Sequence, residues 1–447
     1  MLLLQTMNIN LVLQKLGISQ LNAMQREALD VIGQSQQDVV LLSPTGSGKT
    51  LAYLLPLAQL LDVSDDAVQV LVVVPGRELA LQSHRVLKDM GSGIRSAACY
   101  GGRTAMEEHR KLKEIRPQVV FGTPGRLCDH LDKENISPYT VRLVVIDEFD
   151  KCLEMGFHDE MSRLLGKLPG LRRRILLSAT DADQIPDFVR LGSCVRMNYL
   201  SEDEQVPQRV SLYRVDCQQK DKLPTLRALL CQQGDVQSIV FLNYRDAVER
   251  VGDFLRREGF AVSVFHGGME QKDREAALYR FSNGSATVLV CTDLASRGLD
   301  IPDVGSVIHY HLPVNDQEMI HRVGRTARWD KWGDTFFLVG PEETFPAFVD
   351  ADVQAYPLDE AGVDAEPPQP RMATIYIGKG KKDKLSRGDI MGFLCKKGGL
   401  DRSEIGRIDV ADRYAYAAVA RTRLQQVLRQ TAGEKIKGLR TVVEPVK

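Results

Sequence analysis

Short apolar runs alternate with longer amphipathic stretches along residues 20–200, and this alternation predicts a parallel β-sheet covered by helices. The expected fold class of this part of the chain is therefore α/β. A strand is predicted at each of the apolar runs Val39–Leu42, Val70–Val74, Val119–Phe121, Leu143–Ile146 and Ile175–Leu177.

The same rhythm restarts in the second half of the chain, which lacks a phosphate-binding glycine loop of its own. Between the halves, Ser201–Gln208 is polar and acidic and contains Pro207, so we place an inter-domain linker there. Two tandem domains are expected, at residues 1–202 and 209–345. The strands predicted in the second domain are Gln237–Leu242, Ala261–Phe265, Ala286–Cys291, Val304–Tyr310 and Thr335–Val339.

A further boundary is expected near residue 370. Residues 341–370 contain eight acidic residues, no Lys or Arg, and the run Pro367-Pro368-Gln369-Pro370. This composition predicts a linker over 346–371 that is stiffened by proline and extended by its own charge. The last segment, 372–447, has the element order of an α+β RNA-recognition fold: strand 374–377, helix 388–397, strand 406–410, strand 414–420, helix 422–430 and strand 439–443.

Length and charge agree with this division. A chain of 447 residues is too long for one ordinary core, so two or three domains are expected. The net charge is −1, but residues 371–447 hold 18 basic and 8 acidic residues, a balance of +10 that leaves −11 for the rest. An acidic body with a basic tail indicates that the tail meets a polyanion; the alternative is a merely solvated basic surface.

Cysteine usage and hydropathy bear on the compartment. The eight cysteines are scattered without any CxxC pair, so neither a zinc site nor a disulfide framework is expected, and a reducing cytosol fits. Met1–Leu4 is too short and lacks the basic lead of a signal peptide. No apolar run approaches the roughly 20 residues that span a bilayer, so we expect a cytoplasmic protein without membrane contact.

The segment Ser43–Thr50, Ser-Pro-Thr-Gly-Ser-Gly-Lys-Thr, carries the clearest chemistry. A strand, a glycine loop ending in Lys-Thr and a helix form the phosphate-binding loop of a nucleotide-hydrolysing enzyme. Its backbone N–H groups attract phosphate oxygens, Lys49 reaches the β- and γ-phosphates, and Thr50 can ligate Mg²⁺. Ser43 stands where the strict consensus has Gly. The residues expected to bind the nucleotide here are Thr45, Gly46, Ser47, Gly48, Lys49 and Thr50.

A second acidic motif follows the predicted strand Leu143–Ile146. In a parallel sheet, carboxylates at this position lie where the strands open onto a ligand crevice. Asp147 would then hold the Mg²⁺ that bridges the phosphates, and Glu148 would orient or deprotonate the attacking water. The alternative is an acidic first turn of a helix, which Asp and Glu also favour.

Together with further motifs, these two segments resemble the DEAD-box ATP-dependent RNA helicases over roughly residues 10–340. The resemblance implies two RecA-like domains that close around ATP and a single RNA strand. The motifs that carry it, in chain order, are Ser43–Thr50, Pro75–Ala80, Gly101-Gly102, Thr123–Arg126, Asp147–Asp150, Ser178–Thr180, Thr292–Asp300 and His321–Arg328.

The resemblance assigns further roles around the nucleotide. Gln25 matches the glutamine that reads the adenine edge, since an amide can bond adenine N6 and N7 in a bidentate way. Asp300 matches the residue that bonds the ribose. Arg325 and Arg328 match the arginine fingers, whose planar guanidinium groups suit the charge of a transferring phosphoryl group. The residues implied to couple the motifs are Ser178, Thr180 and His321.

For RNA, the resemblance implies contacts to the strand backbone, which carry little base information. Contacts to 2′-hydroxyls would make them RNA-selective. The matching positions of the first domain are Arg77, Gly101, Gly102, Thr123, Gly125 and Arg126, and those of the second are Arg274, Thr292 and Gly298.

The chain departs from the family pattern at three positions. Phe149 replaces the Ala of the family's name, although both flanking carboxylates remain, so ATPase activity is expected to survive. Gly76 replaces a usual Thr, and Ala327 replaces a Gly between the two finger arginines. His309 and His311 have the spacing of metal ligands on a strand but lack a third ligand, so they are interpreted as ordinary strand histidines.

The tail domain resembles the C-terminal domain of the DbpA subfamily over Gly378–Ile390. In an RNA-recognition fold, Tyr376 and Tyr416 would stack bases; the alternative is that they pack in the core or at an edge. Lys379, Lys381 and Lys382, with Lys384 and Arg387, would meet phosphates. The resemblance implies binding to a hairpin of large-subunit ribosomal RNA.

The function expected from these features is ATP-dependent local unwinding of RNA, with ATP and Mg²⁺ as cofactors. The expected partners are 23S ribosomal RNA and pre-50S particles, and the protein is expected to be a monomer. Two alternatives stay open, a general RNA helicase of mRNA turnover and an ATP-dependent RNA clamp that opens no duplex. The fold expected as a whole is α/β, with two tandem RecA-like parallel-sheet domains and a small C-terminal α+β RRM-like domain.

Overall fold

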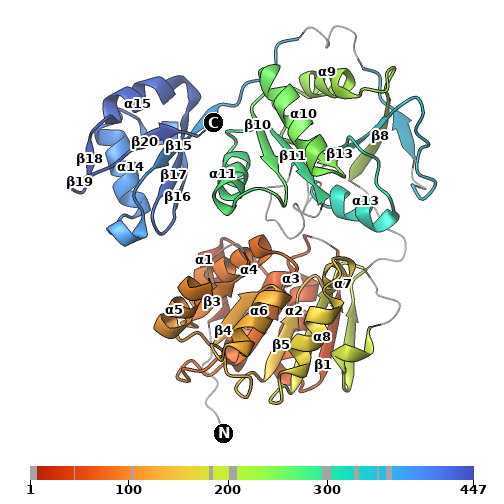
Figure 1. The fold of residues 1–447 in the computed structure, drawn as a ribbon, viewed down its shortest axis with the longest axis vertical. Helices are drawn as coiled ribbons and strands as arrows, with labels where there is room; N and C mark the ends of the chain where they lie inside the picture. The colour runs from red at the N-terminus through yellow and green to blue at the C-terminus, as the bar shows by residue number, and fades with distance from the viewer. Residues whose placement is uncertain are drawn as a thin grey trace. The chain divides into compact units, whose positions relative to one another are not determined.

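The computed structural model describes residues 8–44, 46–101, 105–180, 185–200, 209–293, 304–326, 332–349, 352–358 and 365–446 (Figure 1). The described residues fall into two compact units, one before and one after the stretch 201–208. The first unit holds one parallel-sheet domain, which we call the first domain. The second unit holds another such domain, the second domain, and the tail domain that follows it.

The first domain contains a seven-stranded parallel sheet in the order β3-β4-β2-β5-β6-β1-β7. Its strands are β1 (Asp38–Leu42), β2 (Val70–Val73), β3 (Ser96–Cys99), β4 (Val119–Gly122), β5 (Leu143–Ile146), β6 (Arg173–Ser178) and β7 (Cys194–Asn198). The helices are α1 (Ile9–Leu16), α2 (Ala23–Gln34), α3 (Lys49–Leu60), α4 (Arg77–Met90), α5 (Ala105–Ile115), α6 (Pro124–Asp132), α7 (Phe149–Glu154) and α8 (His158–Gly166), with the 3₁₀ turn η1 (Asp187–Val189).

Helices cover both faces of this sheet, so its central strands are buried on both sides. Val39 and Leu41 of β1 belong to the core on one face, packed with α2, α3 and α4. Val40 and Leu42 belong to the core on the other face, packed with α6 and α8. Because side chains alternate across a strand, burial on both faces requires an unbroken apolar run. This is the pattern that the sequence displays at β1.

The second domain repeats this topology. Its seven-stranded parallel sheet has the order β10-β11-β9-β12-β13-β8-β14, the same order as the first when each sheet is counted from its own first strand. The strands are β8 (Val210–Asp216), β9 (Ser238–Leu242), β10 (Val262–Phe265), β11 (Val288–Thr292), β12 (Ser306–His309), β13 (Gly333–Val339) and β14 (Val353–Ala355). The helices are α9 (Leu223–Gln233), α10 (Arg245–Arg257), α11 (Gln271–Ser282) and α13 (Asp316–Val323).

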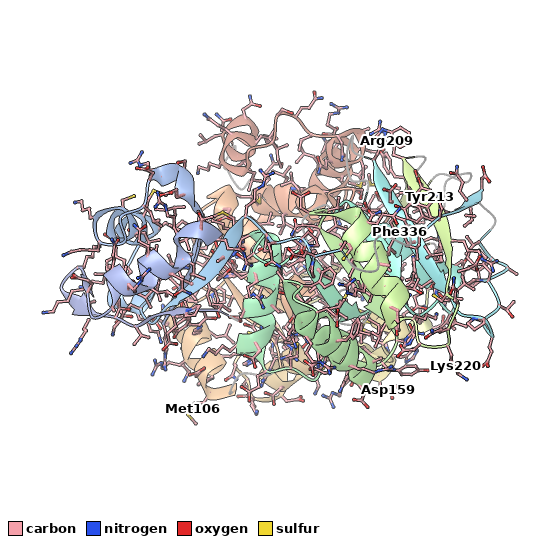
Figure 2. The ribbon with its side chains drawn as sticks, turned by 90° about the horizontal axis from the view of Figure 1, so that it is seen from above. Met106, Asp159, Arg209, Tyr213, Lys220 and Phe336 are labelled. Atoms are coloured by element: carbon pink, nitrogen blue, oxygen red, sulfur yellow. The ribbon has the colours of Figure 1, made fainter. Side chains whose placement is uncertain are left out.

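Part of the segment expected to be an extended linker belongs to this second sheet. Its residues 353–355 form β14, which pairs with β8. Tyr356 then packs edge-on against Tyr213 and Phe336, with ring centroids 5.2 and 5.0 Å apart. Figure 2 labels Tyr213 and Phe336, whose rings stack at 5.3 Å. Farther along, the Gln369 side-chain amide donates to the carbonyl oxygen of Gly259 at 2.9 Å. These described residues therefore lie on the second domain.

The tail domain is an antiparallel four-stranded sheet backed by two helices. Its strand order, β16-β17-β15-β20, is that of an RNA-recognition fold, which confirms the expected α+β class. The fourth strand begins at Val443; the predicted strand 439–443 is wrong because Leu439–Arg440 pairs instead in a small hairpin. The elements are β15 (Met372–Ile377), η3 (Lys381–Asp383), α14 (Arg387–Lys396), η4 (Arg402–Glu404), β16 (Ile405–Val410), β17 (Ala415–Ala420), η5 (Arg421–Arg423), α15 (Leu424–Thr431), β18 (Lys435–Ile436), β19 (Leu439–Arg440) and β20 (Val443–Pro445).

The core of the tail lies between its sheet and its helices, where Ile375 and Ala417 pack with Ile390, Phe393 and Val427. The opposite face of the sheet carries tyrosines, which are described below. Among the helices that the structure describes, none is long and apolar enough to cross a membrane.

Candidate nucleotide and RNA sites

The glycine loop joins β1 to α3 in the first domain. Gly46 and Gly48 have φ angles of 83° and 89°, in the left-handed region that glycine adopts without strain. A Cβ atom on Gly48 would in addition collide with the side-chain amide of Gln25. Successive N–H groups of a glycine-rich turn of this kind can form an anion-binding concavity. Thr45 lies outside the described residues.

Lys49 is the first residue of α3 and is only 9% exposed. Its ammonium group donates hydrogen bonds to the carbonyl oxygen of Ser43 and, at 2.8 Å, to that of Pro44. The charge therefore lies inside the loop, next to the helix N-terminus. Thr50, the next residue, is half-buried.

The N-terminus of α2 is tied to the same loop. Asn22 and Gln25 form a capping box, in which each side chain accepts a hydrogen bond from the other's backbone N–H. The Gln25 amide also donates to the carbonyl oxygen of Gly48 at 3.2 Å, and the Asn22 amide donates to that of Ser47 at 2.9 Å. Gln25 is thus placed beside the loop, and Asn22 is a partner that sequence reasoning missed.

Asp147 and Glu148 follow β5 directly. Asp147 is 3% exposed, and burial raises its pKa to about 6, although the nearby Lys49 ammonium opposes the rise. Its carboxylate accepts the backbone N–H of Glu148 at 3.0 Å. Glu148 has φ 54° and ψ 52°, a left-handed conformation that is strained for a non-glycine residue. Strain of this kind is characteristic of functional sites.

Asp150 connects this motif to the end of β6. Its carboxylate accepts the hydroxyl of Thr180 at 3.0 Å and the backbone N–H of Ala179 at 3.3 Å. The Ser178 hydroxyl in turn donates to the carbonyl oxygen of Thr180 at 2.6 Å. Ser178 and Thr180, predicted as coupling residues, are thus in hydrogen-bond contact with the acidic motif through Asp150.

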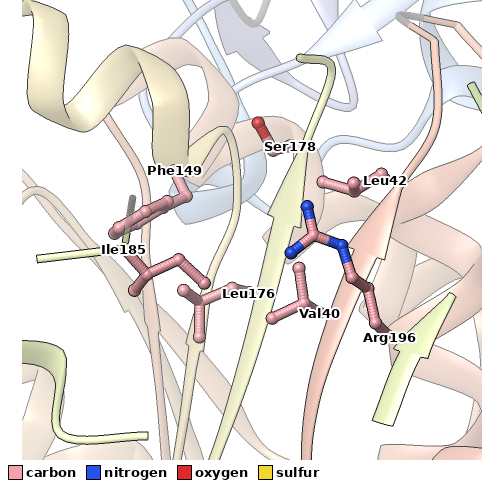
Figure 3. Close-up of a pocket in the computed structure, with 7 residues that line it drawn as sticks. All are labelled: Val40, Leu42, Phe149, Leu176, Ser178, Ile185 and Arg196. Carbon is pink, nitrogen blue, oxygen red and sulfur yellow. The ribbon is translucent and has the colours of Figure 1, made fainter. Parts of the chain in front are cut away.

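The departure at Phe149 is accommodated in the core. Figure 3 shows its ring beside Ile185 and Leu176, in a small, mostly apolar pocket below Ser178 that Arg196 also lines. Phe149 is 2% exposed and packs in the second core of the sheet. Its bulk therefore fills space away from the carboxylates of Asp147 and Asp150.

The predicted RNA contacts of the first domain follow the carboxyl ends of three neighbouring strands. Arg77 begins α4 after β2, Gly101 follows β3, and Thr123, Gly125 and Arg126 lie between β4 and the first turn of α6. Because the carboxyl ends of parallel strands share one edge of the sheet, these residues share that edge with the glycine loop and Asp147. Gly102 lies outside the described residues.

In the second domain, the predicted residues that can be placed are largely buried. Thr292 ends β11 and is 8% exposed. Arg274 is 4% exposed; its guanidinium donates to the carbonyl oxygen of His266 at 3.1 Å and lies 4.4 Å from the Phe265 ring centroid. Three further predicted site residues lie outside the described ranges and cannot be placed: Gly298, Asp300 and Arg328.

The motif around α13 is organised by a residue that sequence reasoning did not single out. Arg322 is fully buried and donates to the carboxylates of Asp293 and Glu318 at 2.6 and 2.7 Å. Its neighbours His321 and Arg325 are buried at the end of α13 and in the following turn. The signal available in the sequence was the position of Asp293 directly after Thr292, and of Arg322 inside the His321–Arg328 motif.

The two strand histidines make ordinary structural contacts. His309 stacks on Phe337 with ring centroids 4.4 Å apart, and burial lowers its pKa well below the usual value. His311 accepts the backbone N–H of Asn243 at 3.1 Å. Both contacts agree with the interpretation of these residues as strand histidines.

On the tail, Tyr376 and Tyr416 are cross-strand partners and therefore lie on the same face of the sheet. Tyr416 is 5% exposed, because its ring stacks on Tyr279 of α11. Tyr376 is half-buried, with the ammonium of Lys272 5.4 Å from its ring centroid. The face of the sheet that carries these tyrosines thus packs on the second domain. A base can stack on the ring of Tyr416 only if the tail separates from α11.

The basic loop of the tail, which we define as residues 379–387, lies outside this contact. Lys381 and Lys382 are exposed in η3, and Lys379 forms an ion pair with Asp383 at 3.2 Å. Lys384 and Arg387 are exposed as well. The loop therefore presents positive charge to solvent.

Three family models match the chain along its length. Residues 22–188 match the model described as DEAD/DEAH box helicase, and residues 221–330 match the helicase conserved C-terminal domain. Residues 374–445 match the DbpA RNA binding domain. The glycine loop and the acidic motif lie in the first match, Arg322 in the second and the basic loop in the third.

Known proteins are similar to all or part of the chain. The chain is 34% identical to the ATP-dependent RNA helicase DbpA of Escherichia coli (strain K12), over 95% of this chain and 94% of that protein. It is 34% identical to the DEAD-box ATP-dependent RNA helicase RhpA of Helicobacter pylori (strain B128), over 73% of this chain and 66% of that protein. Among solved structures, S. cerevisiae Dbp5 bound to RNA and ADP BeF3 matches with a TM-score of 0.71 at 26% identity, covering 78% of this chain and 93% of that one.

Proposed function

The chain belongs to the DEAD-box ATP-dependent RNA helicases, in the DbpA type, and from that premise we propose that it opens short duplexes of large-subunit ribosomal RNA during ribosome assembly. The observation that supports the proposal is the similarity of the tail domain to a known RNA-binding domain. Similarity to the E. coli relative extends over 95% of the chain and includes the RNA-binding domain match at 374–445. The match to the H. pylori helicase covers only 73% of the chain.

For the nucleotide, we assign the loop residues to the phosphates and Gln25 to the adenine, with Asp300 on the ribose. Lys49 supplies positive charge to the β- and γ-phosphates after exchanging its bonds to the loop carbonyls. The loop residues assigned to the phosphates are Thr45, Gly46, Ser47, Gly48 and Thr50.

Thr50 and Asp147 would hold a Mg²⁺ ion, whose charge neutralises the phosphates. The buried carboxyl of Asp147 fits this role, because its raised pKa reflects a site where an ionised carboxylate lacks sufficient compensating charge. We assign Glu148 to orienting or deprotonating the attacking water, and Arg325 and Arg328 to the charge of the transferring phosphoryl group.

The two helicase domains bind the RNA backbone and do not discriminate between sequences, whereas the tail domain determines which RNA is bound. The exposed lysines of the basic loop meet phosphates, so binding weakens as salt rises. Held at its target by the tail, the core acts at a raised local concentration near the duplex. The proposed setting is the cytoplasm, with a monomeric protein on 23S ribosomal RNA and pre-50S particles.

The test compares RNA-stimulated ATPase rates with total ribosomal RNA, ribosomal RNA lacking the target hairpin, and poly(A). A Lys381→Glu/Lys382→Glu variant is measured beside the wild type, because both side chains are exposed and their replacement leaves the packed tail intact. Selective stimulation by intact ribosomal RNA, lost in the variant, supports the proposal. Equal stimulation by all three RNAs in both proteins would leave a general RNA helicase.

A further inference from the structure

One buried acidic side chain, Glu108 of α5, contacts two of the three segments of the first domain that are predicted to bind RNA, those after β3 and β4. It is 3% exposed, and it does not belong to any of the motifs that identify the family. One carboxylate oxygen accepts a hydrogen bond from the backbone N–H of Tyr100, the residue before Gly101, at 3.0 Å. The other lies 3.4 Å from Nε of Arg126. A single carboxylate therefore links the loop after β3 to the first turn of α6.

His130 completes this network. Its Nε2 lies 2.9 Å from the same Glu108 oxygen, and its Nδ1 lies 3.0 Å from the side-chain nitrogen of Asn135. Because an amide nitrogen can only donate, Nδ1 is the acceptor and Nε2 carries the proton that Glu108 accepts. Glu108 thus accepts hydrogen bonds from a backbone amide and an imidazole and forms an ion pair with a guanidinium.

The ligand atoms of Cys99, Glu108 and His130 lie within 4.8 Å of one another, so a metal site has to be considered. Two observations oppose it. Burial raises the pKa of the Cys99 thiol, with the Glu108 charge adding to the rise, and a protonated thiol is a poor ligand. The guanidinium of Arg126 is paired with the carboxylate oxygen that would bind a cation. The cluster is better explained as an anchor for Arg126.

We propose that Glu108 is a positioning residue for RNA binding, which holds Arg126 and the Tyr100–Gly101 backbone in one geometry against the RNA strand. This inference rests on the proposed role of Arg126 and Gly101 in contacting RNA. The Arg126 side chain is 15% exposed; Glu108 pairs with its Nε, and Asp129 lies 3.6 Å from its Nη1. Arginine gains much of its phosphate specificity from a fixed planar geometry, and a buried carboxylate supplies that constraint.

The test is Glu108→Gln, which keeps the shape of the side chain but removes its charge. The RNA concentration that half-saturates ATPase stimulation should rise about tenfold, whereas the KM for ATP and the rate at saturating RNA should stay within about twofold. Arg126→Ala should raise the same RNA constant. The double variant should lose less than the sum of the two single effects, because Glu108 acts in part through Arg126.

Asp38 provides a matched control in the same domain. Its buried carboxylate, like that of Glu108, is held by backbone N–H groups, here those of Arg174 and Gly192 at 2.6 and 2.7 Å. It lies at the opposite end of β1 from the glycine loop. Asp38→Asn should lower the melting temperature without changing the RNA constant. If Glu108→Gln does not fold, Glu108→Asp replaces it, since the shorter side chain keeps the charge but cannot span both motifs.

Four results separate the possible failures. An unchanged RNA constant in the Glu108 variants, with wild-type ATPase stimulated by RNA, would overturn the positioning role alone. Fully additive effects of Glu108→Gln and Arg126→Ala would also overturn the positioning role. So would an equal rise of the RNA constant in Asp38→Asn, because Glu108 would then have only a general structural role. If Arg126→Ala leaves the RNA constant unchanged, the proposed RNA contact of Arg126 fails instead, and the inference fails with it.

Discussion

The ring of Tyr416, on the sheet of the tail, stacks on the ring of Tyr279 in α11 with centroids 5.0 Å apart. The Tyr279 hydroxyl also donates to the carbonyl oxygen of Tyr416 at 3.2 Å. Nearby, the Asn283 side-chain amide donates to the Thr374 hydroxyl at 2.9 Å. The face of the tail that resembles the base-binding face of an RNA-recognition fold is therefore its docking face on the second domain, and the basic loop is left outside the contact.

Replacing Tyr279 should release the tail. Tyr279→Ala removes the stacked ring and the hydroxyl, and we expect the segment 365–371 to become more sensitive to limited proteolysis. Tyr139→Ala is the matched control, because Tyr139 is 76% exposed in the first domain. Equal cleavage of wild type, Tyr279→Ala and the control would mean that this contact does not hold the tail.

The same contact predicts an alkaline transition. Burial raises the pKa of Tyr416 to about 12 and raises that of Tyr279 as well, so both rings are neutral when docked. A tyrosine whose pKa is raised on docking stabilises the contact fully below its ordinary pKa, near 10, and loses that contribution as the pH rises toward 12. Absorbance at 295 nm should reveal late-ionising tyrosines in the wild type. In Tyr279→Ala, two late-ionising tyrosines should be lost, Tyr279 itself and Tyr416, whose pKa returns to the ordinary value; the loss of only one would contradict the account.

Glu148 should matter for chemistry more than for binding. Glu148→Gln keeps the size of the side chain but removes the base, so turnover should fall about 10²- to 10⁴-fold, the typical contribution of general acid–base catalysis. Nucleotide and RNA affinities should change little. Asp159→Asn, at a fully exposed position labelled in Figure 2, should retain wild-type turnover. Wild-type turnover in Glu148→Gln would remove Glu148 from the mechanism.

Restoring the family's usual residue at position 149 should destabilise this protein. Phe149→Ala leaves a cavity among Ile185, Leu176 and Arg196, and truncation of a buried phenylalanine typically costs about 3–5 kcal/mol. The first domain should melt at a lower temperature while the affinity for ATP is retained, because the carboxylates of Asp147 and Asp150 are unchanged. A melting temperature equal to that of the wild type would mean that the pocket collapses without cost.

The buried parallel strands were predictable because burial on both faces demands an apolar run. The edge and small-residue strands were not. Residues Ser96–Cys99 of β3 are too small to stand out, and Cys194–Asn198 of β7 is largely exposed, so neither forms a hydrophobic run. Both strands were missed, as were β8 and β14. These strands form because they pair with neighbouring strands in the folded domain, and a local sequence pattern carries no information about that pairing.

The motif residues were predictable because their chemistry lies in local sequence, a glycine loop or an acidic pair after a strand. The partners that hold them were not, since Glu108 reaches Arg126 and Tyr279 reaches Tyr416 only through packing between distant elements. Glu108 follows another acidic residue on α5 and reads as a solvated helix face. Its burial was the missing information.

The most direct test of the central claim is strand release from two RNAs that carry the same short duplex. One duplex is joined to the large-subunit hairpin, and the other to an unrelated RNA of equal length and charge. We predict ATP-dependent release that is at least about tenfold faster from the first substrate, because the tail raises the local concentration of the core. Equal rates from both substrates would contradict targeting by the tail, and no release with ATP would leave an RNA clamp.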